Sequence, residues 1–344
     1  MSEREPSFVT RYRPAILDAM YRAFDEATSD QPRLPLYDAL RYHLGWLTEE
    51  GAPREGADGK LLRPALLLLS CEALGGDIER ALPAAASAEL IHNFTLLHDD
   101  IEDRSELRHG RPTVWWRWGD ALAINAGDGL WAIARIAMHR LSAVGNHPAR
   151  VLAAMDELDR ACLALCEGQD RDIRSEGDAT IGTDDYLATV RGKTAALTAA
   201  CAAIGAILAG TGDGSVVAMR EFGLHVGLAF QLRDDALGIW GSIGKAPAED
   251  IHSRKLSYPV VYALARATPS DRARLVELYS EAPDDAGVDE AIRILERSGA
   301  REATEAAAHA AAERAVGALH GLALREPFAG ELEALARYAV ERTR

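Results

Sequence analysis

The sequence predicts an all-α protein. Apolar residues recur at helical spacing from one end of the chain to the other, Ala and Leu are abundant, and alternating β-branched runs are nearly absent. Of the 344 residues, 48% are hydrophobic and 26% are charged, a composition that supports a large core. Because no change of composition marks a boundary, we expect a single domain over residues 1–344, with residues 1–8 loose.

Turn-forming residues divide the chain into the expected helices. Ser29–Pro32 separates the first two helices, a Gly-rich loop over 51–60 ends the second, and Gly110 with Pro112 turns the chain after the fourth. Pro269 suits a first helical position. The expected helices cover about 13–26, 35–48, 65–73, 82–103, 120–141, 149–175, 184–210, 222–232, a stretch from 269, 301–324 and 332–343.

The chain is acidic and contains no segment that predicts export or membrane insertion. Lys and Arg total 38 against 53 Asp and Glu, and the net charge of −15 argues against non-specific binding to nucleic acid or to an anionic membrane surface. The first residues lack the apolar core of a signal peptide. Thr194–Gly210, the best candidate for a span, is rich in Ala and Gly and fits a packed core helix. We expect a cytoplasmic protein without a membrane span.

One stretch concentrates the candidate chemistry, because an apolar helical run ends in four carboxylates within five residues. Asp99 and Asp103 are one turn apart on the same helix face, and Asp100 lies beside them. Carboxylates packed this closely repel one another unless a cation or water compensates them. Mg²⁺ suits such oxygens and completes its coordination with waters and substrate phosphates. The alternative is a solvated acidic helix end, which is the commoner role of a lone acidic run.

Basic side chains lie on both sides of this cluster in the sequence. Lys60 and Arg63 follow the Gly-rich loop near a helix start, where a point charge and a bidentate fork can hold an anion, although such a pair is often plain surface. His92 lies two turns before the carboxylates and is either a satisfied core histidine or a phosphate ligand. Arg108 and Arg111 follow them. Acidic groups beside basic groups predict a metal–diphosphate site.

The same pattern occurs a second time. The apolar helix over 222–232 ends at Asp234 and Asp235, and basic residues that include Lys245 and Lys255 follow.

A glycine interrupts the helix between the two clusters. Gly192 weakens that helix by about 1 kcal/mol relative to Ala. A local break there would turn Lys193 and Thr194 toward a ligand.

These motifs together resemble the trans-isoprenyl diphosphate synthases, also called polyprenyl synthetases, over about residues 60–259. The matching residues are Gly59, Lys60, Arg63 and Pro64; Asp99, Asp100 and Asp103; Arg108, Gly110, Pro112 and Thr113; Gly168, Gln169 and Asp172; Lys193 and Thr194; and Phe230, Gln231, Asp234 and Asp235. The resemblance implies one domain of antiparallel helices around a deep cavity, and a homodimer.

The resemblance also implies the reaction of a Mg²⁺-dependent prenyltransferase. Isopentenyl diphosphate would condense, 1′-4 and trans, with dimethylallyl, geranyl or farnesyl diphosphate. Three Mg²⁺ ions and the basic groups would stabilise the departing diphosphate, and the isopentenyl double bond would attack the allylic cation before a proton is lost.

The site residues that the resemblance implies fall into three groups. The metal ligands are Asp99, Asp103 and Asp234, supported by Asp100 and Asp235. The ligands of isopentenyl diphosphate are Lys60, Arg63 and His92. The ligands of the allylic diphosphate are Arg108, Lys193, Thr194, Gln231, Lys245 and Lys255.

Two positions depart from the family pattern. His109 stands where a second arginine is common, so Arg111 or a protonated His109 would bind the isopentenyl diphosphate. Gly238 stands where the second cluster often has its last aspartate, which thins that metal site and leaves Asp250 as a candidate contributor.

Product length remains the least determined feature. Phe94 lies five residues before Asp99, about 7.5 Å along the helix axis, and Thr95 is one turn below Asp99. An aromatic at Phe94 followed by a small residue resembles geranylgeranyl diphosphate synthases, and the alternative for Phe94 is ordinary core. Other readings are a farnesyl or longer-chain synthase, a terpene cyclase and a non-catalytic partner subunit.

Overall fold

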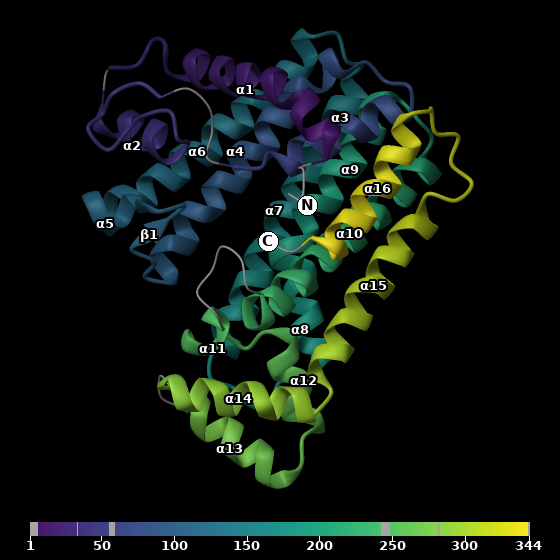
Figure 1. Cartoon of the computed structure of the whole chain (residues 1–344). Coiled ribbons are helices and arrows are strands. Elements are labelled where there is room, and N and C mark those ends of the chain that lie inside the picture. The colour runs from purple at the N-terminus through teal and green to yellow at the C-terminus, as the bar shows by residue number, and fades with distance from the viewer. Residues whose placement is uncertain (1–5, 33, 55–58, 242–247, 281–282, 343–344) are drawn as a thin grey trace.

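The computed structural model describes residues 6–32, 34–54, 59–241, 248–280 and 283–342, and it confirms an all-α protein (Figure 1). The helices are α1 (Ser7–Thr28), α2 (Pro35–His43), α3 (Leu62–Ala73), α4 (Ile78–Glu102), α5 (Val114–Trp118), α6 (Asp120–Ala143), α7 (Pro148–Ser175), α8 (Thr183–Val190), the π-helical turn η1 (Arg191–Ala195), α9 (Ala196–Ala209), α10 (Asp213–Trp240), α11 (Glu249–His252), α12 (Tyr258–Arg266), α13 (Pro269–Ser280), α14 (Asp285–Arg297), α15 (Ala300–Ala318) and α16 (Phe328–Glu341).

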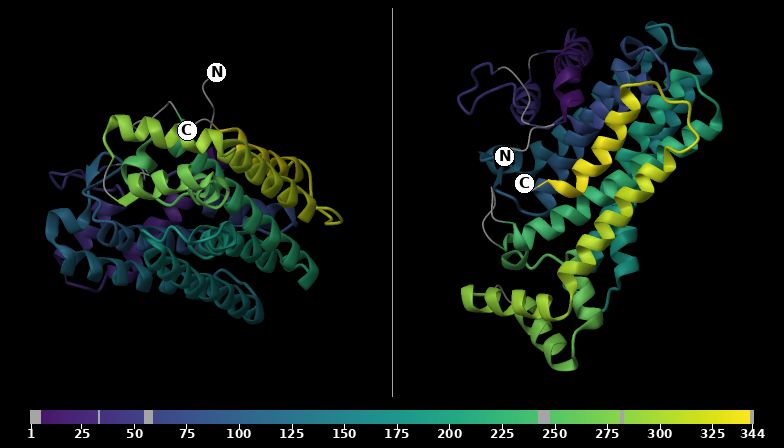
Figure 2. Two further views of the ribbon diagram at one scale, coloured as in Figure 1. Left: turned by 90° about the horizontal axis from the view of Figure 1, so that it is seen from below. Right: turned by 45° about the vertical axis from the view of Figure 1, so that its right-hand side comes forward.

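The helix α9 lies at the centre of the bundle. It packs against α3, α7 and α10, and its side chains are almost all buried. Around it, α4 packs on α6, and α10 packs on the long α15 (Figures 1 and 2). An Ala-rich, apolar sequence therefore forms the middle of the molecule, as predicted for Thr194–Gly210.

Small residues allow these central helices to approach closely. A Cβ atom added to Gly205 of α9 would lie 2.4 Å from the carbonyl oxygen of Leu67 on α3. A Cβ atom added to Gly223 of α10 would lie 2.5 Å from the carbonyl oxygen of Thr198 on α9. Larger side chains at these two positions would push the helices apart, which explains why the core is built on alanine and glycine.

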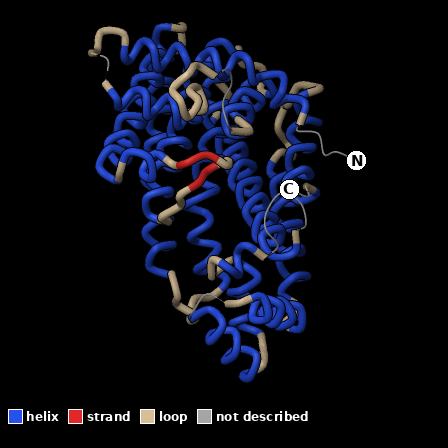
Figure 3. Tube along the Cα trace, turned by 60° about the vertical axis from the view of Figure 1, so that its left-hand side comes forward, coloured by secondary structure: helices blue, strands red, loops and turns tan. Residues whose placement is uncertain are grey.

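Two smaller elements frame the open side of the bundle. The strands β1 (Leu107–Arg108) and β2 (Arg111–Pro112) pair antiparallel, with Arg108 opposite Arg111, and form a short hairpin (red in Figure 3). The helices α12, α13 and α14 form the lower end of the molecule in Figure 1. The hairpin follows the acidic end of α4 in the sequence, and α12, α13 and α14 follow the acidic end of α10.

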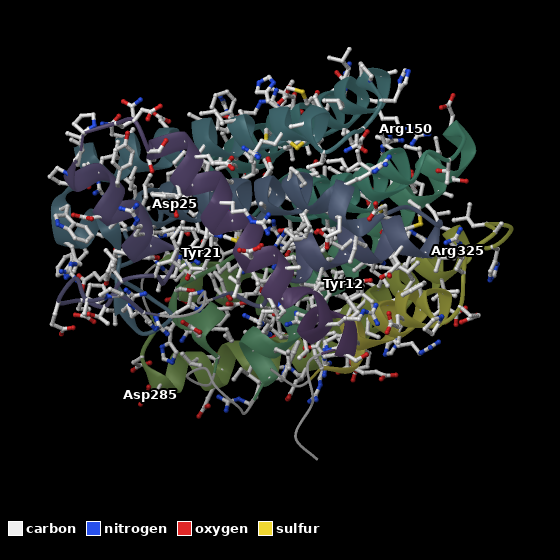
Figure 4. All side chains as sticks on the ribbon, turned by 90° about the horizontal axis from the view of Figure 1, so that it is seen from above. Tyr12, Tyr21, Asp25, Arg150, Asp285 and Arg325 are labelled. Carbon is white, nitrogen blue, oxygen red and sulfur yellow. The ribbon has the colours of Figure 1, made fainter. Side chains whose placement is uncertain are left out.

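The N-terminal helix begins earlier than expected. α1 starts at Ser7, and Phe8 and Val9 are buried, so the prediction of a loose segment is wrong for residues 7 and 8. In Figure 4, Tyr12, Tyr21 and Asp25 follow one another along α1 as it crosses the bundle. The Tyr12 hydroxyl donates a hydrogen bond to the carboxylate of Glu72 on α3, which ties this helix to the core.

One segment passes the length and composition test for a membrane span. It runs over Thr183–Ala209, and 67% of its most apolar window is buried inside the protein. It contains the central helix α9, so its apolar character is that of a core element.

Candidate active site

A cavity of about 1360 Å³ opens between the C-terminal ends of α4 and α10. Its wall includes most of the side chains that the sequence predicted for the site, although these come from separate parts of the chain. They are Lys60, Arg63, His92, Thr95, Asp99, Asp100, Asp103, Arg108, His109, Arg111, Lys193, Thr194, Gln231, Asp234 and Lys255. Of the remaining predicted residues, Phe94 and Asp235 lie off this wall, and Lys245 falls outside the described residues.

The first acidic wall is the end of α4. Asp99 is partly exposed and Asp103 is exposed, whereas Asp100 is only 1% exposed and accepts a 2.7 Å hydrogen bond from Nε of Arg108. Burial raises the pKa of Asp99 to about 6, and the nearby Asp103 carboxylate adds to this effect. Asp99 and Asp103 therefore remain available to a cation, while Asp100 positions an arginine at the mouth of the cavity.

The second acidic wall is the end of α10, and its two aspartates differ in the same way. Asp234 is exposed and its Oδ1 lies 2.6 Å from the guanidinium of Arg342, which follows α16. Asp235 is fully buried and accepts hydrogen bonds from the Tyr186 hydroxyl, from Nε2 of Gln231 (3.0 Å) and from the backbone N–H of Tyr258 (3.1 Å). Asp235 thus joins the end of α10 to the residues packed behind it, and Asp234 faces the cavity.

The sequence predicted a break at Gly192, but the helix between the two walls continues there through a locally wider turn. The turn η1 is π-helical, and Nζ of Lys193 lies 2.6 Å from Asp172 on α7. Burial opposes the charge of Lys193, but Asp172 and Asp99 outweigh it and raise the pKa of the ammonium. The Thr194 hydroxyl donates a 3.1 Å hydrogen bond to Gln231. Lys193 and Thr194 therefore present a cation and a hydroxyl between the acidic walls.

A glycine of α7 makes room for this turn. A Cβ atom added to Gly168 would lie 2.1 Å from the backbone nitrogen of Lys193, which no side chain could occupy. Gly168 therefore sets how close α7 comes to η1.

A group of basic side chains, called here the basic pocket, lines the same cavity. Nη1 of Arg63 lies 3.2 Å from Nε2 of His92, and Lys60 is exposed at the rim. Burial lowers the pKa of His92 well below its ordinary value, and the Arg63 guanidinium acts in the same direction. Glu89 is 3% exposed and supplies the countercharge beneath Arg63, while the side-chain amide of Asn93 donates 3.2 Å and 2.9 Å hydrogen bonds to its side chain and backbone.

The hairpin β1–β2 brings three further groups to this pocket. Arg108 reaches Asp100, Arg111 donates a 2.7 Å hydrogen bond to the carbonyl of Leu47, and His109 has the left-handed φ of 52° at the turn. The guanidinium of Arg111 stacks 4.2 Å above the ring of Tyr42. These contacts fix the hairpin against the segment that follows α2.

Asp250 fills the place that Gly238 leaves open. A Cβ atom added to Gly238 would lie 2.3 Å from Oδ2 of Asp250, so the carboxylate of α11 packs directly on the α10 backbone. Asp250 is 6% exposed, and its charge reaches Lys255. The carboxylate of Asp250 therefore lies beside the second acidic wall, although α10 has a glycine and not an aspartate at position 238.

The two residues predicted to set product length face different ways. Thr95 and Leu96 line the cavity below Asp99. Phe94 instead packs its ring edge-on against His98, with 5.0 Å between the ring centroids. The structure therefore places Thr95, but not Phe94, on the cavity wall.

The acidic groups fit Mg²⁺ that binds together with a phosphate ligand. Among the described residues, no three His, Cys, Asp or Glu side chains converge closely enough to hold a metal by themselves. Mg²⁺ commonly takes one or two carboxylates and fills its other positions with waters and phosphate oxygens. Asp99 and Asp103 offer such a pair, and the buried Oδ2 of Asp100 is still without a partner.

Several groups of the site had no predicted role. Tyr186 contacts Asp235, Arg342 contacts Asp234, and Glu89 compensates the charge of Arg63. The sequence did not indicate these contacts, because each joins residues that are far apart along the chain. Asp172 belonged to a recognised motif without an assigned partner. Its pairing with Lys193 could have been suspected only from the unusual Gly192, because 21 residues separate the two side chains.

Comparisons with known proteins agree with this geometry. A family model described as Polyprenyl synthetase matches residues 46–295. A (2E,6E)-farnesyl diphosphate synthase of Mycobacterium tuberculosis is 38% identical over 310 residues, which cover 88% of this chain and 85% of the relative. A geranylgeranyl diphosphate synthase of the same species is 44% identical over 235 residues, 67% of this chain and 66% of the relative. The crystal structure of a polyprenyl synthetase from Streptomyces coelicolor A3(2) matches with a TM-score of 0.88 at 34% identity, covering 98% of this chain and 100% of that one.

The helical fold and its two-walled cavity define a prenyl-transferring enzyme, a trans-prenyl diphosphate synthase. The chain belongs to the polyprenyl synthetase family. The family uses a divalent metal to bind diphosphate. These relatives are named as synthases and not as cyclases or regulatory subunits, so the product length is the open part of the function.

Glu89 makes the stability of the fold depend on pH. Burial raises the pKa of its carboxyl from 4.5 to about 7, against the opposing charge of Arg63. Between these values the unfolded chain loses the proton first, so the free energy of unfolding falls as the pH rises, by no more than about 3 kcal/mol. Glu89→Gln cannot ionise, and we expect the variant to match the wild type at pH 4.5 and to be more stable at pH 8 in urea unfolding.

The exposed Glu313→Gln provides the control, and it should follow the wild type at both pH values. A Glu89→Gln variant that is less stable at pH 8 would contradict this account, because it would mean that the attraction to Arg63 exceeds the cost of burying the carboxylate.

Proposed function

We propose that the protein condenses isopentenyl diphosphate with an allylic diphosphate to give geranylgeranyl diphosphate, with three Mg²⁺ ions at the allylic diphosphate. The observation that supports the proposal is that one cavity is lined both by two acidic helix ends and by the basic side chains of Lys60, Arg63 and His92. Two diphosphates, one bound through metal and one bound directly by cations, match these two sets of side chains.

The acidic walls and Lys193 bind the allylic substrate. Asp99 and Asp103 from α4 and Asp234 from α10 would hold Mg²⁺, which neutralises the diphosphate as it departs. Arg108, Lys193 and Gln231 face the same region and stabilise the developing anion by charge and hydrogen bonding. Lys255 lies 4.0 Å from Asp235 and adds a cation behind the second wall.

The basic pocket binds the acceptor. Lys60, Arg63 and His92 would hold the diphosphate of isopentenyl diphosphate, so that its double bond points toward the allylic carbon. Apolar side chains below the acidic walls, among them Leu96 and Leu197, shield the allylic cation from water. The departing diphosphate leaves an allylic cation, the double bond attacks it, and the proton is lost from the adduct.

The catalytic assignment predicts that Asp99→Ala removes prenyl transfer. We expect the wild type to incorporate labelled isopentenyl diphosphate in the presence of Mg²⁺ and an allylic primer, and Asp99→Ala to lose at least about 100-fold in turnover, more than the loss of an outer-shell group costs. Asp156→Ala, an exposed aspartate of α7, is the matched control and should turn over normally. A wild type that incorporates nothing with any primer would refute the proposed function, and full turnover by Asp99→Ala would refute the metal assignment alone.

The placement of Thr95 supports a product of 20 carbon atoms, because a small side chain leaves room one turn below Asp99. The relatives include both farnesyl and geranylgeranyl synthases, so the choice between the two products is based on the side chains of the cavity wall. We expect Thr95→Phe to fill that space and to shorten the main product, with chromatography of the dephosphorylated products as the measurement.

Phe94→Ala is the matched test of the neighbouring position. Because the Phe94 ring packs against His98 and away from the cavity, the product of this variant should keep the wild-type length. Longer products from Phe94→Ala, or an unchanged length with Thr95→Phe, would assign the gauge to another residue.

We also propose that the enzyme is a cytoplasmic homodimer. Among the described residues, nine of the twelve exposed large hydrophobic side chains lie between residues 107 and 173, mainly on α5, α6 and α7. These nine are Leu107, Trp116, Trp118, Ile124, Trp131, Ile136, Leu152, Leu163 and Ile173. α6 and α7 are neighbours in the fold (Figure 2), and an apolar surface of this kind is typical of an interface between subunits.

Light scattering tests the dimer directly. The wild type should show twice the chain mass of 37.1 kDa, and the double variant Trp131→Glu with Leu163→Glu should shift toward one chain because charges would be buried in the interface. Val217→Glu, on an exposed position of α10, should leave the mass unchanged. A monomeric wild type, or a double variant that stays dimeric, would refute this interface.

A further inference from the structure

An arginine close to the C-terminus binds a carboxylate to which the proposed function assigns a metal ion. Arg342 follows α16, which packs against α10 (Figure 1), and its side chain lines the same cavity as Asp234. Nη2 of Arg342 lies 2.6 Å from Oδ1 of Asp234. A guanidinium and a Mg²⁺ ion both bind carboxylate oxygens, so the two cations compete for this side chain.

Several contacts with α10 hold Arg342 in this position. The same Nη2 donates a 2.9 Å hydrogen bond to the carbonyl of Phe230, and the guanidinium stacks 4.6 Å from the centroid of the Phe230 ring. The backbone carbonyl of Arg342 accepts a 2.8 Å hydrogen bond from Nε of Arg233. Only 4% of the Arg342 side chain is exposed. The pair is therefore a buried part of the second wall, unlike the exposed ion pairs that contribute little to a structure.

The two acidic walls differ in how far protein cations neutralise them. At the second wall, Asp234 is paired with Arg342, and Asp235 lies 4.0 Å from the ammonium of Lys255. At the first wall, Asp99 and Asp103 form no ion pair within the described part of the chain. A metal ion therefore meets two carboxylates without an ion-pair partner on α4, but a carboxylate that already has a countercharge on α10.

We propose that Arg342 is a further residue of the allylic site and that it competes with Mg²⁺ for Asp234. The inference rests on the proposed function, because it assumes that Asp234 is a metal ligand. In the free enzyme, Arg342 weakens metal binding at the second wall in two ways, since it occupies Oδ1 of Asp234 and adds a positive charge beside it. The first wall therefore binds its metal before the second wall does.

The allylic diphosphate changes this balance. Its negative charges attract both the guanidinium and a metal ion, so the two cations can share the second wall once an anion lies beside them. Metal binding at Asp234 is then coupled to substrate binding, and each favours the other by the same factor. Asp234 consequently takes its metal together with the substrate and not before it.

Mn²⁺ binding tests the competition without turnover. Mn²⁺ serves as the probe, and electron paramagnetic resonance measures the free ion in a titration of the full-length protein without substrate. Arg342→Met keeps an apolar side chain on Phe230 and removes the charge. We expect it to bind Mn²⁺ at the second wall at least about 5-fold more tightly than the wild type, the effect of one ionic contact in water. Arg337→Met, at an exposed arginine of α16, is the matched control and should bind as the wild type.

Two further variants separate the charge from the fold. Arg342→Lys keeps the charge and should restore the weaker binding. Asp234→Asn combined with Arg342→Met should bind no more Mn²⁺ than Asp234→Asn alone, because the two cations meet at that carboxylate. If urea unfolding in a chelator shows that Arg342→Met folds poorly, Arg342→Gln replaces it, since its amide can still donate to the carbonyl of Phe230.

Inorganic diphosphate tests the coupling. The titrations are repeated with this anion at matched concentrations of free Mn²⁺. Because the anion offsets the charge of Arg342, the difference in Mn²⁺ affinity between the wild type and Arg342→Met should shrink. An undiminished difference would overturn the coupling to substrate.

Equal or weaker Mn²⁺ binding by Arg342→Met, or a gain that survives in the double variant, would overturn the inference. A purely structural arginine would give the first of these results, because its loss would destabilise the fold without freeing a metal ligand. A failure of the proposed function is distinct. If the wild type transferred no prenyl group with any primer, the synthase proposal would fail, while the Mn²⁺ titrations would still decide the role of Arg342.

Discussion

The repulsion between carboxylates is the constraint on which the rest of the structure depends. The ends of α4, α7 and α10 bring aspartates to one cavity, and like charges in a partly buried site cost free energy unless cations compensate them. The protein provides one cation for each of four aspartates, and each cation comes from a different element. The pairs are Asp100 with Arg108, Asp172 with Lys193, Asp234 with Arg342 and Asp235 with Lys255.

These pairs also divide the aspartates by task. Asp235 is buried and accepts hydrogen bonds from three protein groups, and Asp100 is buried with Oδ1 bound by Arg108 and Oδ2 without a partner, whereas their neighbours Asp99 and Asp234 face the open cavity. A helix can achieve this with adjacent residues, because consecutive side chains point in directions about 100° apart. In each pair of adjacent aspartates, the first side chain faces the cavity and the second is buried and contacts protein groups.

Local patterns along the sequence predicted the helical fold, both acidic clusters and an irregular turn at Gly192, because each depends on residues within a few turns of one another, although the helix bulges there and does not break. The sequence could not predict Arg342, Tyr186 or the approach of Asp250 to Gly238, since these contacts join helices that are far apart along the chain. The start of α1 was missed for a similar reason. Phe8 and Val9 form a short apolar run that becomes recognisable as helix only when it packs on the core.

The π-helical turn has a consequence for how the chain tolerates insertions and deletions. A π turn holds one residue more than an α turn, so removing one residue between Arg191 and Ala195 could restore a continuous α-helix. Such a deletion would keep α9 in phase with α8, because the π turn already absorbs the extra residue. Without the π turn, the same residues in an α-helix would rotate α9 by about 100° relative to α8 and carry its small residues away from α3 and α10. The π turn therefore sets the rotation of α9, which forms the core, relative to α8, which faces the cavity. Adding or removing a residue elsewhere in either helix would change that rotation.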